Sequence, residues 1–339
     1  MNVLVVSPVF NGSTSLMRLD SMRELLPRDT NIEVIDTQKL IDKGSRLCRI
    51  MAYRYKSGPL VKSINSFISK YSFKKNYGLI WVEKGVLLKP NTIKLLKDKT
   101  TLLVHYTPDP AFSFHKSKKF YNSLKYYDKV ITTKSFELEN YYRYKNKNSV
   151  MLVTQAYSHE MHRSFNEFRK RKNAVVFIGH FEKSRGEVLQ HLLDNNIVIS
   201  LSGRGWNEFV RQNKKIKHFT FLGEKTYGTA YTQTLNEYKY SIGFLSEWIP
   251  ELHTTRTFEI PACGCLLLTP ENEEIRGFYD DSDVVFYDSK NQLLDKLIYF
   301  FENENEAYIL ALNGLNKTIN GPYSHYMIMQ NILRNMGIT

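Results

Sequence analysis

The 339-residue sequence has few cysteines and no long apolar run. Because no run of about 18 apolar residues occurs, we expect no membrane-spanning helix. Its three cysteines, Cys48, Cys263 and Cys265, have no metal-ligand spacing and are too few for a disulfide framework. The opening residues, MNVLVVSPVF, lack the basic lead and the small-residue cleavage site of a signal peptide. Together these absences predict a protein of the reducing cytoplasm.

Two ligand-binding motifs are also missing. No Gly-x-Gly-x-x-Gly sequence occurs, which leaves a dinucleotide cofactor unsupported. There is no clear acidic metal site either, because residues 280–283 have the pattern of a solvated loop before a strand. We therefore expect neither a cofactor nor a bound metal.

Acidic residues are scarce in the first half of the chain. Residues 1–170 contain 30 Lys and Arg against 14 Asp and Glu, whereas residues 171–339 contain 17 against 20. The two halves thus carry +16 and −3, which together give the net charge of +13. Such asymmetry indicates that the first half meets an acidic partner or an anionic surface.

The most basic stretch is residues 43–76, which contain nine basic residues and no acidic one, with aromatic residues interleaved. A solvated helical face is one interpretation. A surface that contacts anionic phospholipid or an acidic acceptor is another. Nucleic acid is the third, but we expect no such partner because no recognised nucleic-acid-binding motif is present.

Short apolar runs alternate with helical patterns along the chain, which predicts an α/β protein with parallel sheets. The length suits two domains of about 150 residues each. A polar, basic segment, residues 159–172, separates two series of runs and is the predicted linker. The expected strands are residues 2–7, 32–35, 78–82, 102–104, 129–132, 150–153, 174–178, 197–201, 266–269 and 284–287.

Residues just after these strands are candidate site residues, because ligands of open α/β sheets bind beyond the carboxyl ends of the strands. Glu83, Lys84 and residues 105–109 follow strands of the first series. In the second series, Gly179 lets a backbone approach a ligand closely, and Arg185, in a helix expected to be capped by Ser184, could reach a phosphate. A surface position for Arg185 is the alternative.

Residues 251–269, ELHTTRTFEIPACGCLLLT, carry the densest set of signals. Glu251 and Glu259 are separated by seven residues, about two helical turns, so both could face one direction from a helix. Hydrogen-bonding side chains and a guanidinium at a helix start suit an anionic ligand. These are His253, Thr254, Thr255 and Arg256. An ordinary amphipathic helix with its charges in water is the alternative.

Residues 253–264, HTTRTFEIPACG, closely resemble a motif of the spore-maturation (CgeB-like) family of GT-B glycosyltransferases, whose C-terminal domain is of the glycosyl transferases group 1 type. The spacing of Glu251 and Glu259 is also similar to the acidic pair of retaining GT-B enzymes. The resemblance implies two Rossmann-like parallel-sheet domains that face each other across a cleft. We expect an acceptor domain at 1–165, a donor domain at 172–321, and a helix at 322–339 that packs back on the first domain.

By this resemblance, the second domain binds the nucleotide sugar without a metal. Thr254, Thr255 and Arg256 would hold the pyrophosphate, helped by Gly179 and Arg185. Glu259 would accept hydrogen bonds from the ribose hydroxyls. The residues expected to border the nucleobase are Gly203, Arg204, Trp206 and Gly223.

The resemblance also implies catalytic and acceptor-side residues. Glu251 or His253 would lie near the transferred sugar, although His253 could instead cap a helix. Asp109 and His105 are candidate bases or sugar contacts, and a strand-end packing role is open for His105. The acceptor-side candidates are Glu83, Lys84 and Tyr106.

The implied function is transfer of a sugar from a nucleotide-sugar donor, with UDP favoured, to a glycan, lipid-linked or protein acceptor in bacterial surface polysaccharide or glycoconjugate synthesis. Peripheral contact with the anionic inner face of the cytoplasmic membrane would account for the basic half. Two other classes stay open. One is a nucleotide-sugar epimerase or hydrolase of the same fold, and the other is a non-catalytic protein that binds anionic polymers.

Overall fold

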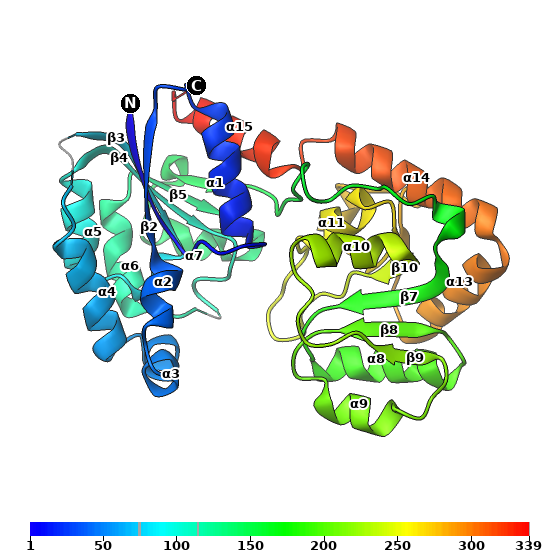
Figure 1. Cartoon of the computed structure of the whole chain (residues 1–339). Helices are drawn as coiled ribbons and strands as arrows, with labels where there is room; N and C mark the ends of the chain where they lie inside the picture. Colours follow the sequence, from blue (N-terminus) through cyan, green and yellow to red (C-terminus); the bar gives the residue numbers. More distant parts are fainter. Residues whose placement is uncertain (74–75, 114, 339) are drawn as a thin grey trace. The chain divides into compact units, whose positions relative to one another are not determined.

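The computed structural model describes residues 1–73, 76–113 and 115–338 and divides into two compact units (Figure 1). Met1–Thr154 with Met329–Thr339 form the first unit, and Gln155–Ile328 form the second. The boundary therefore precedes residues 159–172, the segment expected to be a linker. That segment packs inside the second unit, where Arg171 donates hydrogen bonds to the Cys263 carbonyl and to the Asn236 side chain.

The first unit contains a six-stranded parallel sheet in the order β2-β1-β3-β4-β5-β6. The register places Val6 of β1 opposite Ile35 of β2 on one side and Val82 of β3 on the other. The inner strands β1 and β3 are mostly apolar, as expected for strands covered on both faces, whereas the edge strand β2 carries polar and partly exposed residues. The strands are β1 (Asn2–Ser7), β2 (Asn31–Asp36), β3 (Tyr77–Glu83), β4 (Thr100–Thr107), β5 (Lys129–Thr132) and β6 (Val150–Leu152).

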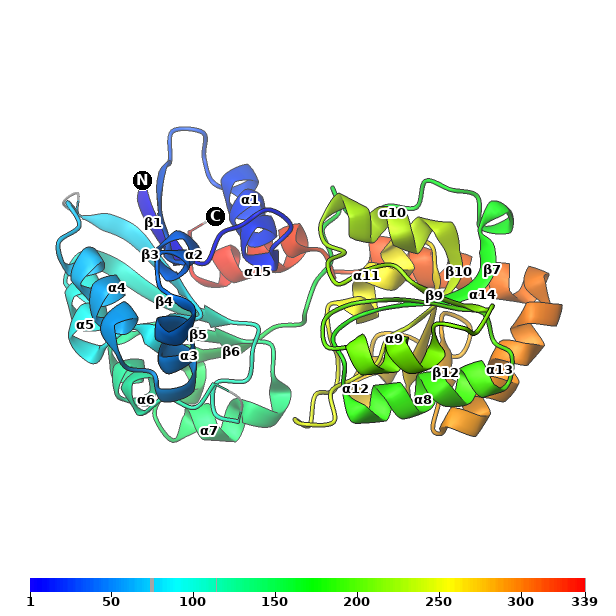
Figure 2. The same cartoon turned by 60° about the horizontal axis from the view of Figure 1, so that its bottom comes forward.

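Helices cover both faces of this sheet. Figures 1 and 2 show α4, α5 and α6 on one face and α1 and α15 on the other. The helices are α1 (Thr14–Leu25), α2 (Thr37–Asp42), α3 (Arg46–Tyr55), α4 (Pro59–Ser69), α5 (Pro90–Lys97), α6 (Lys118–Ser123), α7 (Leu138–Tyr142) and α15 (His325–Asn335). Helix α15 begins in the second unit, and its residues from Met329 onward belong to the first.

The second unit has a parallel sheet in the order β12-β11-β10-β7-β8-β9. One face packs against α8 and α13, and the other packs against α10 and α11. The strands are β7 (Lys172–Ile178), β8 (Ile199–Ser202), β9 (Phe219–Phe221), β10 (Tyr238–Ile242), β11 (Leu266–Pro270) and β12 (Val285–Tyr287). The helices are α8 (Lys183–Asp194), α9 (Asn207–Asn213), α10 (Thr229–Glu237), α11 (Arg256–Ala262), α12 (Glu273–Arg276), α13 (Lys290–Glu302) and α14 (Glu304–Asn320).

The ten strands expected from the sequence are confirmed. The sequence pattern gave no assignment for β9, which has three residues, or for β10, whose Tyr-Lys-Tyr-Ser-Ile sequence is buried although two of its side chains are polar. One expected helix start is wrong: α8 begins at Lys183 after Glu182, not after Ser184. Helix α11 begins at Arg256 with Thr255 as its N-cap, which leaves His253 and Thr254 in the preceding loop. Among the residues described, no helix combines the length and apolar character needed to cross a bilayer.

Candidate functional site

Three glycines at the carboxyl ends of neighbouring strands shape one edge of the second unit. Gly179 follows β7, Gly203 follows β8 and Gly223 comes shortly after β9. Gly203 has a φ of +145°, and an added Cβ would lie 1.8 Å from the Gly179 carbonyl oxygen, so only glycine fits there. The Gly203 N–H donates to the Gly223 carbonyl at 3.0 Å. This edge of the sheet therefore presents backbone with no side chains at these three positions.

Arg256, the first residue of α11, lies against the Gly179 turn. Its Nε donates to the Ile178 carbonyl at 3.0 Å, and its guanidinium carbon lies 5.8 Å from the centroid of the Phe177 ring. A Cβ added to Gly179 would come within 3.0 Å of Arg256 Nη2. A guanidinium is thus fixed beside the bare backbone at the end of β7.

A second guanidinium, that of Arg185, is held nearby and is almost fully buried. It donates to the carbonyls of His180 and Leu245 at 3.1 and 3.2 Å. Burial and the positive charge of Arg256 lower the pKa of Arg185 to about 10, against the opposing effect of Glu182. Arg185 is still charged at neutral pH, so an anionic ligand at this edge would relieve its repulsion with Arg256.

Glu182, which no sequence motif singled out, anchors this cluster. Its side chain is fully buried, with Oε1 at 2.7 Å from Arg185 Nη2 and 3.0 Å from His180 Nε2. Its Oε2 accepts hydrogen bonds from the Ser246 hydroxyl at 3.2 Å and from the Glu247 N–H at 2.9 Å. The sequence pattern that could have identified Glu182 is an acidic residue three positions before an arginine at a helix start. Glu182 therefore pairs with Arg185, and Arg256 supplies the second guanidinium of the cluster.

Glu251 and Glu259 do not share a helix face, contrary to the prediction. Because α11 starts at Arg256, Glu259 is helical while Glu251 lies in the preceding loop. Glu259 is buried, with its Oε1 3.9 Å from His162 Nε2. The negative charge of Glu251 is near enough to act on Arg185 and oppose the lowering of its pKa. The loop, not a helix face, brings Glu251 toward the arginine cluster.

His253 has a structural position that differs from the expected place beside the transferred sugar. It is buried, and its Nε2 accepts a hydrogen bond from the Gln155 N–H at 2.8 Å. Its Nδ1 lies 2.6 Å from Glu274 Oε2, so the ring proton belongs on Nδ1, which donates to that carboxylate. Since both ring nitrogens are engaged, His253 fixes the loop before α11 and is a poor candidate for catalysis.

The two threonines before Arg256 differ in their surroundings. Thr255 is the half-buried N-cap residue of α11. Thr254 is buried, and within the described chain its Oγ1 has no hydrogen-bond partner. A buried hydroxyl without a partner is rare in folded proteins. A ligand oxygen would satisfy it.

The sequence predicts that Trp206 borders the nucleobase, but the structure does not place it at an open site. Its side chain is fully buried, and its Nε1 donates to the Gly179 carbonyl at 2.8 Å. The ring packs edge-on against Phe181 with centroids 5.0 Å apart. Trp206 therefore fixes the Gly179 turn from inside, whereas Arg204 beside it is exposed.

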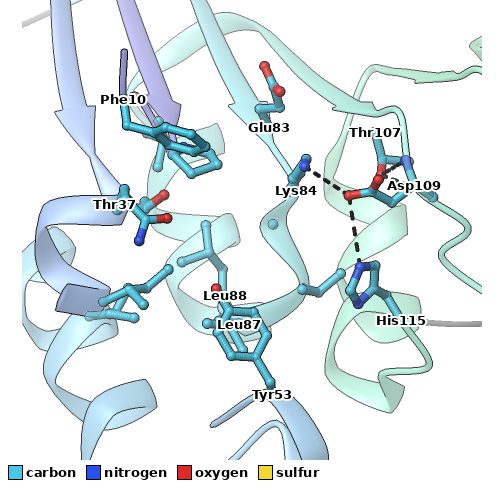
Figure 3. A pocket seen from close by; sticks show the side chains of 17 residues that line it. Phe10, Thr37, Tyr53, Glu83, Lys84, Leu87, Leu88, Thr107, Asp109 and His115 are labelled. Carbon is cyan, nitrogen blue, oxygen red and sulfur yellow. Dashed lines mark hydrogen bonds and ion pairs between the residues drawn. The ribbon is translucent and has the colours of Figure 1, made fainter. Parts of the chain in front are cut away.

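A cavity of about 170 Å³ lies at the carboxyl ends of β1, β3 and β4 in the first unit (Figure 3). Its walls combine apolar side chains, such as Phe10, Leu87 and Leu88, with polar ones, such as Thr37 and Tyr53. Lys84, Asp109 and His115 form a charged group that lines part of this cavity (Figure 3). His115 was not among the residues selected from the sequence.

Asp109 is the centre of that charged group. Its Oδ2 lies 2.9 Å from Lys84 Nζ and 3.8 Å from His115 Nε2. Burial alone would raise the pKa of Asp109, but the Lys84 ammonium and, less strongly, His115 hold it below its ordinary value. The side chain is still 34% exposed. Asp109 is therefore an ionised carboxylate that a ligand in the cavity can reach.

Glu83 and Tyr106, the other expected acceptor-side residues, have supporting positions. The Glu83 carboxylate accepts a hydrogen bond from Ser15 Oγ at 2.5 Å and forms a buried ion pair with Arg18. The Arg18 guanidinium lies 4.6 Å from the centroid of the Tyr106 ring, which stacks on Trp81. Glu83 borders the cavity with its carboxylate already bonded, and the buried Tyr106 ring is not open to an acceptor.

His105 cannot serve as the predicted base. It is fully buried in the sheet, with its ring centroid 4.8 Å from that of Phe120 and 5.1 Å from that of Tyr127. Burial lowers the pKa of His105 to about 3, so the ring is neutral at physiological pH. The packing role that the sequence left open is the one observed.

Comparisons with known proteins give a fold and one partial family match. Residues 185–334 match the family model described as glycosyl transferase-like. Over its whole length the chain is similar to Anabaena HepE in complex with UDP, with 12% identity, 100% of each chain covered and a TM-score of 0.67. Sucrose-phosphate synthase from Thermosynechococcus elongatus aligns over 99% of this chain and 98% of its own, with 13% identity and a TM-score of 0.69.

A glycosyltransferase from Rickettsia africae is also similar, with 14% identity, 99% and 98% coverage and a TM-score of 0.64. The chain thus has the GT-B fold, with two parallel six-stranded α/β units, as expected. No curated protein sequence gives a significant match. The narrower resemblance to the spore-maturation family stays a prediction, because the matching model is described only as glycosyl transferase-like.

Proposed function

We propose that this protein is a glycosyltransferase that uses a nucleotide-sugar donor, with UDP as the favoured nucleotide. The observation that carries the proposal is the pair of immobilised guanidiniums, Arg185 and Arg256, at the glycine-lined strand ends of the second unit. Fixed donors of this kind stabilise the charge that develops on a diphosphate leaving group. The match of residues 185–334 and the UDP bound by HepE support the same assignment.

In this proposal the pyrophosphate lies against Arg256, Arg185 and the turn at Gly179, with Thr254 Oγ1 bonded to one of its oxygens. Thr255, at the N-cap of α11, contributes to the same contact. Glu259 accepts hydrogen bonds from the ribose, and Glu251 faces the transferred sugar. The nucleobase is bordered by Gly203, Arg204 and Gly223.

The acceptor occupies the cavity of the first unit, where Asp109 contacts its hydroxyl. When the bond from the sugar to the diphosphate breaks, the nucleoside diphosphate leaves with the electron pair and the acceptor oxygen bonds to the anomeric carbon. Asp109 takes or orients the hydroxyl proton, and Lys84 keeps Asp109 ionised before reaction. The apolar side chains in its walls favour a glycan or lipid-linked acceptor that has an apolar portion. We place this reaction in the cytoplasm, in synthesis of a bacterial surface polysaccharide or glycoconjugate.

A thermal-shift screen against UDP-, GDP-, dTDP- and CMP-sugars tests the proposal. A donor at 100 times its dissociation constant adds roughly 2.7 kcal/mol to the free energy of unfolding. Release of the nucleoside diphosphate is then measured with and without candidate acceptors. Acceptor-independent turnover would favour the epimerase or hydrolase alternative, and the absence of any donor shift would favour the binding protein.

Replacing Arg256 with alanine is expected to weaken donor binding. The change removes a charge-assisted contact to phosphate, worth roughly 1.5–3 kcal/mol, which corresponds to about tenfold or more in the dissociation constant. Calorimetric titration of the donor measures it.

Arg211→Ala is the matched control. Arg211 lies in the same unit, but its guanidinium is exposed and paired with the surface residue Glu208. The control should bind donor as the unmodified protein does. Equal affinities of a folded Arg256→Ala variant and of the control would remove Arg256 from the site.

Activity is expected to survive EDTA. The leaving group has two arginines to neutralise it, and the acidic run 280–283 has other partners. In that run, Asp281 pairs with Arg276 at 2.7 Å and Asp283 lies 3.5 Å from Lys317. Transfer is assayed after dialysis against EDTA and again with added magnesium or manganese. A loss that either metal restores would contradict this prediction.

A further inference from the structure

Helix α3 (Arg46–Tyr55) buries almost nothing. Ala52 is its one buried residue, whereas the neighbouring α4 buries five of its eleven. Figure 1 shows α3 as the lowest element of the first unit in that view, next to α4. A helix that contributes so little to the core needs another explanation for its apolar residues.

Those apolar residues form one exposed face. Leu47 is 73% exposed, Ile50 is 47%, Met51 is 41% and Tyr55 is 62%. Their spacing of three, four and eight residues from Leu47 puts them on the same side of the helix. The opposite side carries the buried Ala52. Contiguous exposed apolar side chains of this kind mark an interaction surface.

Positive charge surrounds this face. Arg46 and Arg54 are exposed, and Arg49 is half-buried, with its Nη1 3.8 Å from the carboxylate of Asp42. Residues 43–73 contain no acidic side chain. Lys62 on α4 adds another exposed cation. The face therefore complements a surface that is anionic outside and apolar beneath.

We propose that α3 docks on an anionic lipid membrane. Leu47, Ile50 and Met51 enter the boundary between headgroups and acyl chains, and the arginines contact lipid phosphates. An interfacial helix with an apolar face and basic flanks binds membranes in this way. A nucleic acid would leave the aliphatic face unused. A second copy would place two basic helices against each other.

Tyr53 connects this surface to the candidate site. It lies on α3 and also lines the cavity that contains Asp109. Docking of α3 would thus place the cavity beside the lipid surface, where a lipid-linked acceptor presents its hydroxyl. This last step alone rests on the proposed function, whereas docking itself does not.

Sedimentation of the full chain with vesicles tests the docking. Phosphatidylcholine vesicles are compared with vesicles that also contain phosphatidylserine or cardiolipin, at low and high salt. We expect binding to the anionic vesicles only, weakened by salt. Because each basic residue near an anionic surface contributes roughly a fivefold factor, Arg46→Gln/Arg49→Gln/Arg54→Gln should weaken binding roughly 100-fold.

Two further variants distinguish vesicle binding through α3 from binding through the overall positive charge of the first unit. Leu47→Ser/Ile50→Ser/Met51→Ser keeps every charge and should also weaken binding. Lys94→Gln/Lys99→Gln/Lys147→Gln removes three exposed charges elsewhere in the first unit and should leave binding nearly unchanged. Thermal unfolding checks that each variant is folded.

Several outcomes would overturn the proposal. These are no binding to anionic vesicles at low salt, an equal loss in the lysine variant, or undiminished binding by the serine variant. A dimer that the serine substitutions dissociate would make a second copy the occupant of this face. Donor affinity, measured on the same variants, should not change. Vesicle binding by a protein without donor affinity would refute the proposed function and leave docking intact.

Discussion

Asp109→Asn is expected to lower the rate of sugar transfer by roughly 10²- to 10⁴-fold, the range that a positioned acid or base contributes. The asparagine keeps the size of the side chain but cannot accept the acceptor's proton. Because Asp109 belongs to the first unit, donor affinity in the second unit should be unchanged. Initial rates of acceptor glycosylation and calorimetric donor binding measure the two effects separately.

Asp98→Asn is the matched control for this change. Asp98 is an exposed residue at the end of α5 and belongs to the same unit. A rate loss that is confined to Asp109→Asn would assign the effect to the cavity. If both folded variants transfer sugar at the unmodified rate, Asp109 is not the base, and the cavity serves only for binding.

The pH dependence of the transfer rate provides a second test of Asp109 as the base. Transfer needs the carboxylate, so the rate should fall as pH drops through the pKa of Asp109. That pKa is held below its ordinary value by Lys84 against the opposing effect of burial. Lys84→Met removes the cation and leaves burial to raise the pKa. The acid limb of the rate profile should therefore move to higher pH, which a purely structural role for Asp109 would not produce.

Gly203→Ala is expected to disrupt the donor site and destabilise the second unit by roughly 2–6 kcal/mol. The new Cβ would lie 1.8 Å from the Gly179 carbonyl oxygen, at a φ of +145° that side chains avoid. Relief requires movement of the β7–α8 turn, whose Ile178 and His180 carbonyls hold Arg256 and Arg185. Donor affinity should fall with stability. Calorimetric unfolding and a donor thermal shift measure both.

Gly223→Ala separates backbone strain from the steric clash. Gly223 also has a positive φ, +103°, but an added Cβ would meet nothing within 4 Å. Gly223→Ala should therefore lower the free energy of unfolding by about 1–3 kcal/mol through backbone strain alone. Equal destabilisation by the two alanines would mean that the contact between Gly203 and Gly179 is unimportant.

The sequence by itself determined the class of the fold and most of its strands. Runs such as Asn2–Ser7 are apolar at every position but the ends, because parallel strands covered on both faces select that pattern. Helix limits were harder. Residues 253–255 carry helix-like polar spacing, yet they are held in a loop because His253 accepts a hydrogen bond from the Gln155 N–H and donates one to Glu274.

Local sequence also marked the arginines and glycines of the candidate donor site. It could not show which of the neighbouring polar side chains would be accessible to a ligand. His105 and Asp109 lie four residues apart, but the strand carries His105 into the core, between Phe120 and Tyr127. The following loop leaves Asp109 open to the cavity.

Burial and long-range pairing were decided only by the tertiary structure. Glu182 became the anchor of Arg185 because the strand ends enclose it, and Trp206 turned inward to bond the Gly179 carbonyl. The exposed face of α3 likewise depends on which side of that helix packs against the unit. Propensity and periodicity act along the chain, whereas desolvation and charge pairing depend on residues that only the folded chain brings together.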